Sequence, residues 1–200
     1  MKLVAATGNK DKLLEFSRIL SPLGIEVLSP AEIGIAEFDV SETGDTFAEN
    51  AAIKAKAMFE RSGLPSFADD SGLCIDALDG RPGVYSARYL DGLPQDEKNL
   101  GILKELANIA DENRTARFIC NIHCILRKDK TVITEGACEG EIAHSPSGDG
   151  GFGYDPIFLY DGKSFASLSD AEKDKASHRG IALRELAEKL EEFLKIQGDN

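Results

Sequence analysis

Two adjacent carboxylates, Asp69 and Asp70, stand between two apolar pieces of the chain and constrain its fold more than any other feature. Phe67-Ala68 precedes them, and the apolar piece 73–75 follows after Ser71-Gly72. Adjacent acids repel each other and resist burial unless a cation or water neutralises them. A Mg²⁺ ion completed by substrate phosphates would do so, because it prefers hard oxygen ligands. The four residues Asp69-Asp70-Ser71-Gly72 are also good turn formers, so this stretch alone favours a solvated turn between two short strands.

Chain length and charge limit the classes of protein to consider. The 200 residues suit one domain, 1–200, with a sizeable core. The net charge of −12 argues against binding a nucleic-acid polymer, although a small anion can still bind where lysines or arginines gather. No apolar run approaches the ~20 residues of a membrane span, and the opening run is too short for a signal peptide. We therefore expect a cytoplasmic protein.

The four cysteines do not have the spacing of a metal site. Two of them, Cys120 and Cys124, lie in a segment that alternates like a strand, and the chain has no C-x-x-C pair. Their neighbours at 118, 122 and 126 are apolar and would share the same face. We expect buried thiols here, and a zinc or redox protein built on these cysteines is the weaker alternative.

The beginning of the chain reads as a strand, a glycine turn and a helix. Residues 2–6 are apolar, Thr7-Gly8-Asn9 follows, and the spacing of apolar residues predicts a helix over 10–20. Free N–H groups at such a turn, together with the positive helix end, form a cradle for an anion, and Lys10 and Lys12 add charge. The P-loop pattern is absent, because no second glycine with Lys and Ser or Thr follows. A plain strand–helix connection is the alternative reading.

A second helix is predicted over 46–61, after a short strand at 25–28. Thr46 and Glu49 have the spacing of a capping box at its start. Glu42 lies in the loop before this cap, where an acid is either a ligand or part of the surface. Lys54, inside the helix, is either solvated or directed at a ligand.

The remaining elements complete an α/β domain. We expect a helix over 95–107, a hairpin of strands 114–126 and 131–139, and a final amphipathic helix over 176–196. With no repeat or linker, these elements predict one α/β domain on a mixed sheet. The residues expected on the inner sides of the two helices are Leu100, Leu103, Leu106, Ile181, Leu183, Leu186, Leu190, Phe193 and Leu194.

A glycine-rich loop over 148–153 matches G-x-G-x-x-G letter for letter. The sequence Tyr154-Asp155-Pro156 cannot open the helix that a dinucleotide site requires, so that site is not expected. The loop still carries Phe152 and Tyr154 beside a permissive backbone, where an aromatic ring can stack on a flat ligand. Packing of both aromatics into the core is the alternative.

A cluster of cations precedes the last helix. Arg179 can bind an oxygen-rich partner through two hydrogen bonds, and Lys173 can meet a phosphate as a point charge. His178 stands beside Arg179 in a polar context. Cations at a helix start interact unfavourably with the helix dipole. Because this small penalty is accepted here, the cluster indicates anion recognition rather than a merely solvated helix end.

Five motifs in this order resemble the inosine triphosphate pyrophosphatase family, whose members hydrolyse non-standard purine nucleoside triphosphates. The resemblance runs from residue 3 to about 187. The motifs are Thr7-Gly8-Asn9-Lys10-x-Lys12, Glu42 with the following residues 44–51, residues 67–73, residues 152–156, and Ser177-His178-Arg179.

This resemblance implies a fold, a reaction and a cofactor. The fold would be an elongated α/β structure with a long mixed sheet dividing two lobes and the substrate in the cleft between them. The reaction would be Mg²⁺-dependent cleavage of ITP, dITP and XTP between the α- and β-phosphates, which yields the monophosphate and pyrophosphate. The family is also homodimeric, so a homodimer is expected.

The resemblance also assigns roles to individual residues. Glu42 and Asp70 would bind the metal, Asp70 would be the catalytic aspartate, and Ser71 would touch substrate. The role of Asp69 stays open between metal ligand and supporting acid. The residues implied for the triphosphate are Thr7, Gly8, Asn9, Lys10, Asp11 and Lys12, with Lys54 in support; those implied for the nucleotide pocket are Phe152, Gly153, Tyr154, Asp155, Lys173, His178 and Arg179.

Residue chemistry gives a consistent hypothesis for the reaction. Asp70 would act as general base on a water that attacks the α-phosphorus, and Lys12 and Lys173 would stabilise charge on the leaving pyrophosphate. Donors from Arg179, His178 or loop amides would select a 6-oxo over a 6-amino purine. Two alternatives remain: a pyrophosphatase for dUTP, dTTP or modified bases, and a nucleotide-binding protein without activity.

Overall fold

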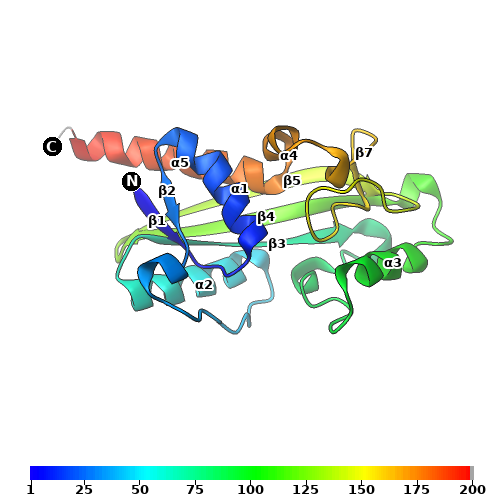
Figure 1. Cartoon of the computed structure of the whole chain (residues 1–200), viewed down its shortest axis with the longest axis horizontal. Coiled ribbons are helices and arrows are strands. Elements are labelled where there is room, and N and C mark those ends of the chain that lie inside the picture. Colours follow the sequence, from blue (N-terminus) through cyan, green and yellow to red (C-terminus); the bar gives the residue numbers. More distant parts are fainter. Residues whose placement is uncertain (199–200) are drawn as a thin grey trace. The chain divides into compact units, whose positions relative to one another are not determined.

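The computed structural model describes residues 1–198, and the side chains of residues 1–195. Its strands form one mixed sheet in the order β2-β1-β3-β4-β5-β6-β7 (Figure 1). β1 runs parallel to β2 and β3, whereas β6 is antiparallel to β5 and β7. This confirms the predicted α/β class with a mixed sheet. The elements are β1 Lys2–Ala5, α1 Lys10–Leu20, β2 Glu26–Leu28, α2 Phe47–Ser62, β3 Ser66–Ile75, α3 Gln95–Glu105, β4 Thr115–Arg127, β5 Lys130–Ile142, β6 Phe158–Tyr160, β7 Lys163–Ser164, α4 Asp170–Ala176 and α5 His178–Gly198.

The chain divides into two compact units, each with its own hydrophobic core. The first unit contains Met1–Asp70, Cys120–Gly136 and the chain from Arg179 onward. The second contains Ser71–Ile119 and Ala137–His178. Strands β3, β4 and β5 contribute residues to both units, so the boundary falls inside these strands.

The strands of the first unit bury both of their faces. Along β1 and β3, successive side chains point to opposite sides, because a strand repeats every two residues. Leu3 and Phe67 pack against α1 and α5 in the larger core, which includes Phe16 of α1. Val4 and Ala68 pack on the other side, where α2 contributes Ala55 and Met58. α1 and α5 therefore cover one face and α2 covers the other (Figure 1).

Both helices that follow strands in the first unit begin where the sequence predicts. Asn9 caps α1, since its side chain accepts hydrogen bonds from the backbone N–H groups of Asp11 and Lys12. Thr46 and Glu49 form the predicted capping box at the start of α2. The helices predicted over 10–20 and 46–61 are thus confirmed as α1 and α2.

The predicted turn at residues 69–72 is wrong. β3 runs unbroken from Ser66 to Ile75, and Asp69 and Asp70 are only 3% and 7% exposed. Turn preferences are local, and here they are outweighed because cationic side chains from neighbouring helices neutralise both acids. The two acids are therefore part of the buried strand.

The second unit has an aromatic core. Phe158 and Phe165 are fully buried and pack with the strand residues Leu73 and Ile75. Beside this core, the buried guanidinium of Arg114 donates hydrogen bonds to three backbone carbonyls, those of Leu106, Ile142 and Ala143, at 2.7–2.8 Å. These bonds tie the chain after α3 to the end of β5.

Several predicted inner positions need correction. Leu106, which caps the end of α3, is buried as expected, but on the helix Leu100 is 55% exposed and Ile102 takes the inner position. On the last helix, Ile181 and Leu194 are exposed, whereas the core packs around the leucines between them. The helix predicted over 176–196 is confirmed as α5, which begins two residues later, at His178; the short helix α4 that precedes it, and ends before Ser177, is not predicted from the sequence.

The predicted strand face at residues 118–126 is confirmed. Phe118 and Leu126 are less than a tenth exposed, and Cys120, Ile122 and Cys124 are fully buried. Burial raises the pKa of the Cys124 thiol to about 12, which keeps it protonated and unreactive. These cysteines are core residues.

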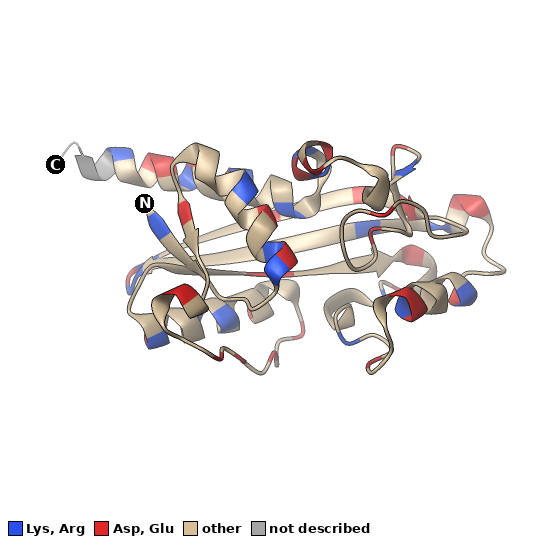
Figure 2. Cartoon of the chain, viewed as in Figure 1, with Lys and Arg blue, Asp and Glu red and all other residues tan. Residues whose placement is uncertain are grey.

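Charged residues of both signs occur along the helices. Figure 2 shows acidic and basic residues interspersed on α1, α3 and α5. None of the helices within residues 1–198 is long and apolar enough to cross a membrane.

Candidate functional site

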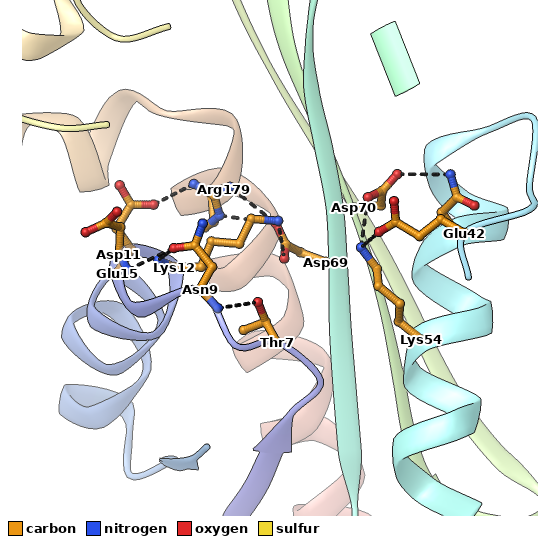
Figure 3. Close-up of polar contacts among 11 residues, drawn as sticks. Thr7, Asn9, Asp11, Lys12, Glu15, Glu42, Lys54, Asp69, Asp70 and Arg179 are labelled. Carbon is orange, nitrogen blue, oxygen red and sulfur yellow. Dashed lines mark hydrogen bonds and ion pairs between the residues drawn. The ribbon is translucent and has the colours of Figure 1, made fainter. Parts of the chain in front are cut away.

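The carboxylates of Asp69 and Asp70 lie on opposite faces of β3. Since side chains alternate along a strand, Asp69 continues the face of Phe67 and Asp70 continues the face of Ala68. Figure 3 shows Asp69 directed towards α1 and Asp70 directed towards α2. The strand thereby separates two acids that are adjacent in sequence, and the two pair with different cations.

Asp69 is held by two cations on its side of the strand. Lys12 Nζ lies 2.8 Å from Asp69 Oδ1, and the Nε and Nη2 atoms of Arg179 each lie 3.3 Å from Oδ2. Burial alone would raise the pKa of Asp69, but the charges of Lys12 and Arg179 outweigh it and hold the pKa well below 3.8. Asp69 is therefore a permanently ionised partner for two cations.

A third acid completes this network. Glu15 of α1 is only 4% exposed, and its Oε2 atom accepts a hydrogen bond of 2.6 Å from Arg179 Nη1. Arg179 thus directs three of its N–H groups at two buried carboxylates, which fixes the plane of the guanidinium. The position of Arg179 is set by Glu15 and Asp69 together.

Asp70 has a different environment on the other face. Lys54 Nζ donates a hydrogen bond of 2.8 Å to Asp70 Oδ1, and Asn50 Nδ2 donates one of 3.4 Å to Oδ2. Burial raises the pKa of Asp70 above 3.8, and the negative charge of Glu42 adds to this while Lys54 partly offsets it. Asp70 is thus easier to protonate than Asp69.

Lys54 also binds the predicted metal ligand Glu42. Its Nζ atom lies 2.8 Å from Glu42 Oε1, the same distance as from Asp70 Oδ1. Although burial disfavours the charged ammonium, the charges of Asp69 and Asp70 raise the pKa of Lys54 above 10.5. The two carboxylates on this face therefore share one cation.

This convergence fits a magnesium site in its donor chemistry. Two carboxylate oxygens, from Glu42 and Asp70, already point at one cation position (Figure 3). Mg²⁺ is commonly held by one or two carboxylates, with water and substrate phosphates as its other ligands. Among the described residues, no group of three or more His, Cys, Asp and Glu side chains is placed to hold a metal.

The turn between β1 and α1 leaves its backbone accessible. Thr7 Oγ1 accepts a hydrogen bond from Asn9 N at 3.1 Å, which shapes the turn. Residues 8–11 are exposed, and Lys12 is the member of this motif that reaches inward. The predicted triphosphate residues thus split into an exposed helix start, with Lys10 and Asp11, and one lysine paired with Asp69.

In the second unit, Asp155 and Lys173 form a buried ion pair. Lys173 Nζ lies 2.6 Å from Asp155 Oδ2 and 4.6 Å above the centre of the Phe152 ring. The same Asp155 oxygen accepts a hydrogen bond of 2.8 Å from Phe152 N. Asp155 therefore holds both the Lys173 ammonium and the backbone at Phe152, and its buried carboxylate is a support for them.

The glycines of this loop allow close packing. Gly151 has φ of +68°, and a Cβ atom there would collide with the Asp155 carboxylate. Gly148 has φ of +82°, and its Cβ would meet the backbone of Ala166 at 2.5 Å. The glycine-rich sequence therefore serves a tight loop, and no helix follows it, as predicted.

Two further contacts hold the loop from the side of α3. Tyr154 is buried and its hydroxyl donates a hydrogen bond of 2.8 Å to the carbonyl of Ser86. Asn99, which is 1% exposed, donates from Nδ2 to the carbonyl of Gly153 at 3.2 Å. Tyr154 thus packs into the core, the alternative considered for it, while Phe152 remains partly exposed.

His178 and Ser71 also belong to the second unit. The His178 ring stacks on Phe118, with ring centres 4.7 Å apart and planes 12° from parallel. Ser71 is partly buried on β3. Together with Phe152, Gly153, Asp155 and Lys173, they are the candidate residues of this unit.

Sequence reasoning missed three polar residues that support these sites: Glu15, Asn50 and Asn99. Glu15 lies three residues after Lys12 on α1, so helical spacing alone placed the two on one side. Asn50 likewise precedes Lys54 by one helical turn. Nothing in the sequence connects Asn99 to the loop at Gly153, because that contact forms only in the folded chain.

The chain is similar over most of its length to known proteins. A family model described as the Ham1 family matches residues 3–189. The chain is 50% identical over 186 residues to the dITP/XTP pyrophosphatase of Halalkalibacterium halodurans, which covers 92% of this chain and 95% of that protein. It is 48% identical over 191 residues to the dITP/XTP pyrophosphatase of Bacillus subtilis, covering 94% and 96%.

Solved structures agree with these relatives. A HAM1 protein from Coxiella burnetii has a TM-score of 0.85 and 40% identity, covering 96% of this chain and 99% of that one. A nucleoside-triphosphatase described as a dITP/XTP pyrophosphatase from Mycobacterium abscessus has a TM-score of 0.72 and 42% identity, covering 93% and 98%. These matches confirm the family resemblance that the five motifs predict. The chain therefore belongs to the Ham1 family.

Proposed function

We propose that this protein hydrolyses non-standard purine nucleoside triphosphates, namely ITP, dITP and XTP, to the monophosphate and pyrophosphate. The observation that carries this proposal is the placement of Asp70. It is a buried carboxyl with a raised pKa that converges with Glu42 on one cation position. It lies in a chain 50% identical to a dITP/XTP pyrophosphatase over 92% of its length. The enzyme is thus a nucleoside-triphosphate pyrophosphatase.

Asp70 is the general base in this proposal. It accepts a proton from the water that attacks the α-phosphorus, and the raised pKa of its carboxyl makes it a better base than an ordinary aspartate. Glu42 and Asp70 are the residues that would hold Mg²⁺, which when bound neutralises charge on the phosphate oxygens. Asn50 supports Asp70 by donating to the oxygen that Lys54 does not contact.

The start of α1 binds the triphosphate. Residues 8–11 at this helix start are exposed, and the helix dipole favours phosphate oxygens there, although the N–H groups of Asp11 and Lys12 are bonded to the Asn9 side chain. Lys10 and Lys12 add positive charge at this end, so negative charge that builds on the leaving pyrophosphate is stabilised here. Asp69 keeps Lys12 in place by pairing with its ammonium group.

Phe152, Lys173, His178 and Arg179 are proposed to bind the nucleotide. The Phe152 ring offers a face on which a purine can stack. N–H donors of this set would pair with the 6-oxo group of hypoxanthine or xanthine, whereas a 6-amino group would leave a donor facing a donor. Guanine also has a 6-oxo group, so GTP is the most informative competitor to test.

A turnover panel tests the proposal. Pyrophosphate release is measured for ITP, dITP, XTP, GTP, ATP, dUTP and dTTP, with and without Mg²⁺. The expected result is Mg²⁺-dependent release with kcat/KM for ITP and XTP at least about a hundredfold above that for ATP. A preference for dUTP or dTTP would replace the substrate assignment. Binding of ITP without any turnover would indicate a nucleotide-binding protein instead.

Two other properties remain predictions from the sequence. The homodimer is tested by the mass of the full chain in solution, measured by light scattering. The cytoplasmic location is tested by fractionating cells that express the tagged chain.

A further inference from the structure

Lys54 occupies the position at which the two proposed metal ligands converge. Its Nζ atom is 2.8 Å from Glu42 Oε1 and 2.8 Å from Asp70 Oδ1, and its side chain is only 12% exposed (Figure 3). Asn50 contacts the other oxygen of Asp70. Both oxygens of the proposed base therefore accept hydrogen bonds from side chains of α2.

The two donors differ in their freedom to move. Asn50 is fully buried, and its Oδ1 atom accepts a hydrogen bond of 2.8 Å from Gly44 N, so its amide is fixed at both ends. Lys54 has a flexible four-carbon stem, which lets the ammonium change partners. Lys54 is thus the donor that can leave Asp70.

We propose that the ammonium of Lys54 is the cation held by Glu42 and Asp70 before the nucleotide arrives, and that it moves to the phosphates when the nucleotide binds. This rests on the proposed function, because it takes Glu42 and Asp70 as the metal ligands. The same movement frees Glu42 Oε1 and Asp70 Oδ1, the two oxygens that would hold the metal. Metal and nucleotide therefore bind together, with little metal bound beforehand.

Electrostatics gives the reason for this order. An ammonium at hydrogen-bond distance from both carboxylates already neutralises one of their two negative charges. A divalent ion on the same oxygens would lie close to that ammonium, and like charges at such a distance repel strongly in a partly buried site. Phosphate oxygens give the ammonium another partner and so remove the repulsion. By thermodynamic linkage, the factor by which the nucleotide increases metal affinity equals the factor by which the metal increases nucleotide affinity.

Mn²⁺ binding to the full chain without nucleotide tests this directly. The free Mn²⁺ signal in electron paramagnetic resonance gives the dissociation constant for the wild type, Lys54→Gln and Lys56→Gln. Lys56 is the matched control, since it lies on the same helix with a side chain 70% exposed. We expect Lys54→Gln to bind Mn²⁺ at least about tenfold more tightly than the wild type, and Lys56→Gln to resemble the wild type. Equal affinity of wild type and Lys54→Gln would overturn the proposal.

A Glu42→Gln variant separates this inference from the proposed function. Mn²⁺ binding is measured with a non-hydrolysable ITP analogue, corrected for the Mn²⁺ that the analogue binds by itself. If Glu42→Gln binds Mn²⁺ as the wild type does, the metal assignment itself fails. If Glu42→Gln weakens binding while Lys54→Gln gains nothing, the metal assignment stands and the role of Lys54 is wrong.

The wild type provides a test even if Lys54→Gln does not fold. The analogue should then increase the Mn²⁺ affinity of the wild-type protein at least about tenfold over the protein alone. An unchanged affinity would overturn the proposal. Lys54→Arg, which keeps the charge, should retain the weak Mn²⁺ binding of the wild type.

Discussion

Asp69 and Asp70 are consecutive residues of β3, yet their pKa values move in opposite directions. The cations Lys12 and Arg179 hold the pKa of Asp69 below 3.8, whereas burial raises that of Asp70. When the environments of two acids shift their pKa values apart, the two acids commonly have different roles in a reaction. Asp69 is thus a fixed counter-ion of Lys12 and Arg179, and Asp70 is the acid that we propose for proton transfer.

Asp69→Asn should destabilise the protein. Removing this charge leaves Lys12 and Arg179 with a neutral amide in a buried site, which we expect to cost about 3 kcal/mol of unfolding free energy at pH 7. A group with a lowered folded pKa contributes stability above its unfolded pKa and loses it as pH falls. Urea unfolding should therefore show the difference between wild type and variant narrowing as pH falls below 3.8. A difference that widens there would contradict the assignment.

Glu15→Gln should also destabilise the protein, by about 2 kcal/mol or more. Glu15 is buried and contacts Arg179 Nη1 at 2.6 Å, so its removal leaves this guanidinium short of a charged partner. Glu26→Gln is the matched control, because Glu26 pairs with Lys2 at 3.0 Å on the surface with a side chain 55% exposed. Urea unfolding of both variants is the measurement. An equal loss of unfolding free energy in the two variants would show that burial does not strengthen the pair of Glu15 and Arg179.

The buried pair of Asp155 and Lys173 should show strong coupling in a double-mutant cycle. Lys173→Met and Asp155→Asn each leave one buried group without its partner, at a cost of about 3 kcal/mol. The double variant removes both charges, so its loss of unfolding free energy should be smaller than the sum of the two single losses. Additive losses would mean that the 2.6 Å contact contributes nothing.

Gly151→Ala should disturb the loop that carries Phe152. Its φ of +68° strains any other residue, and the new Cβ would also collide with the Asp155 carboxylate. Gly162→Ala is the control, since φ is +73° there but a Cβ would meet nothing within 4 Å. We expect about 1 kcal/mol of destabilisation for Gly162→Ala and clearly more for Gly151→Ala, measured by thermal unfolding. Equal destabilisation of the two variants would show that the loop rearranges to make room for the new Cβ beside Asp155.

The parts of the fold that depend on local chemistry follow from the sequence. The α1 bounds at Lys10 and Leu20 and the capping box of Thr46 with Glu49 were predicted because each rests on neighbours within a few residues. The buried cysteine face of β4 was predicted from its alternation alone. In the candidate site, Glu42 and Lys54 were named from the sequence, and the structure brings both to Asp70.

The errors arise where distant residues decide the outcome. Asp69 and Asp70 have the local preferences of a turn, and only cations from helices far away in sequence make them part of a buried strand. Leu100 and Ile102 differ in exposure because of what α3 packs against, which helical spacing does not specify. The short helix α4, which the prediction lacks, does have a local signal: Ser169 and Glu172 form a capping box at its start.

The turnover number of Asp70→Asn with ITP tests the central claim most directly. The amide cannot accept a proton from water, so kcat should fall by about 10²–10⁴. Thermal unfolding should show a folded protein. Burial opposes the ionised form of Asp70, which offsets part of the stability lost when Lys54 has a neutral amide in place of this carboxylate. An Asp70→Asn protein that is folded and turns over ITP at the wild-type rate would contradict the account.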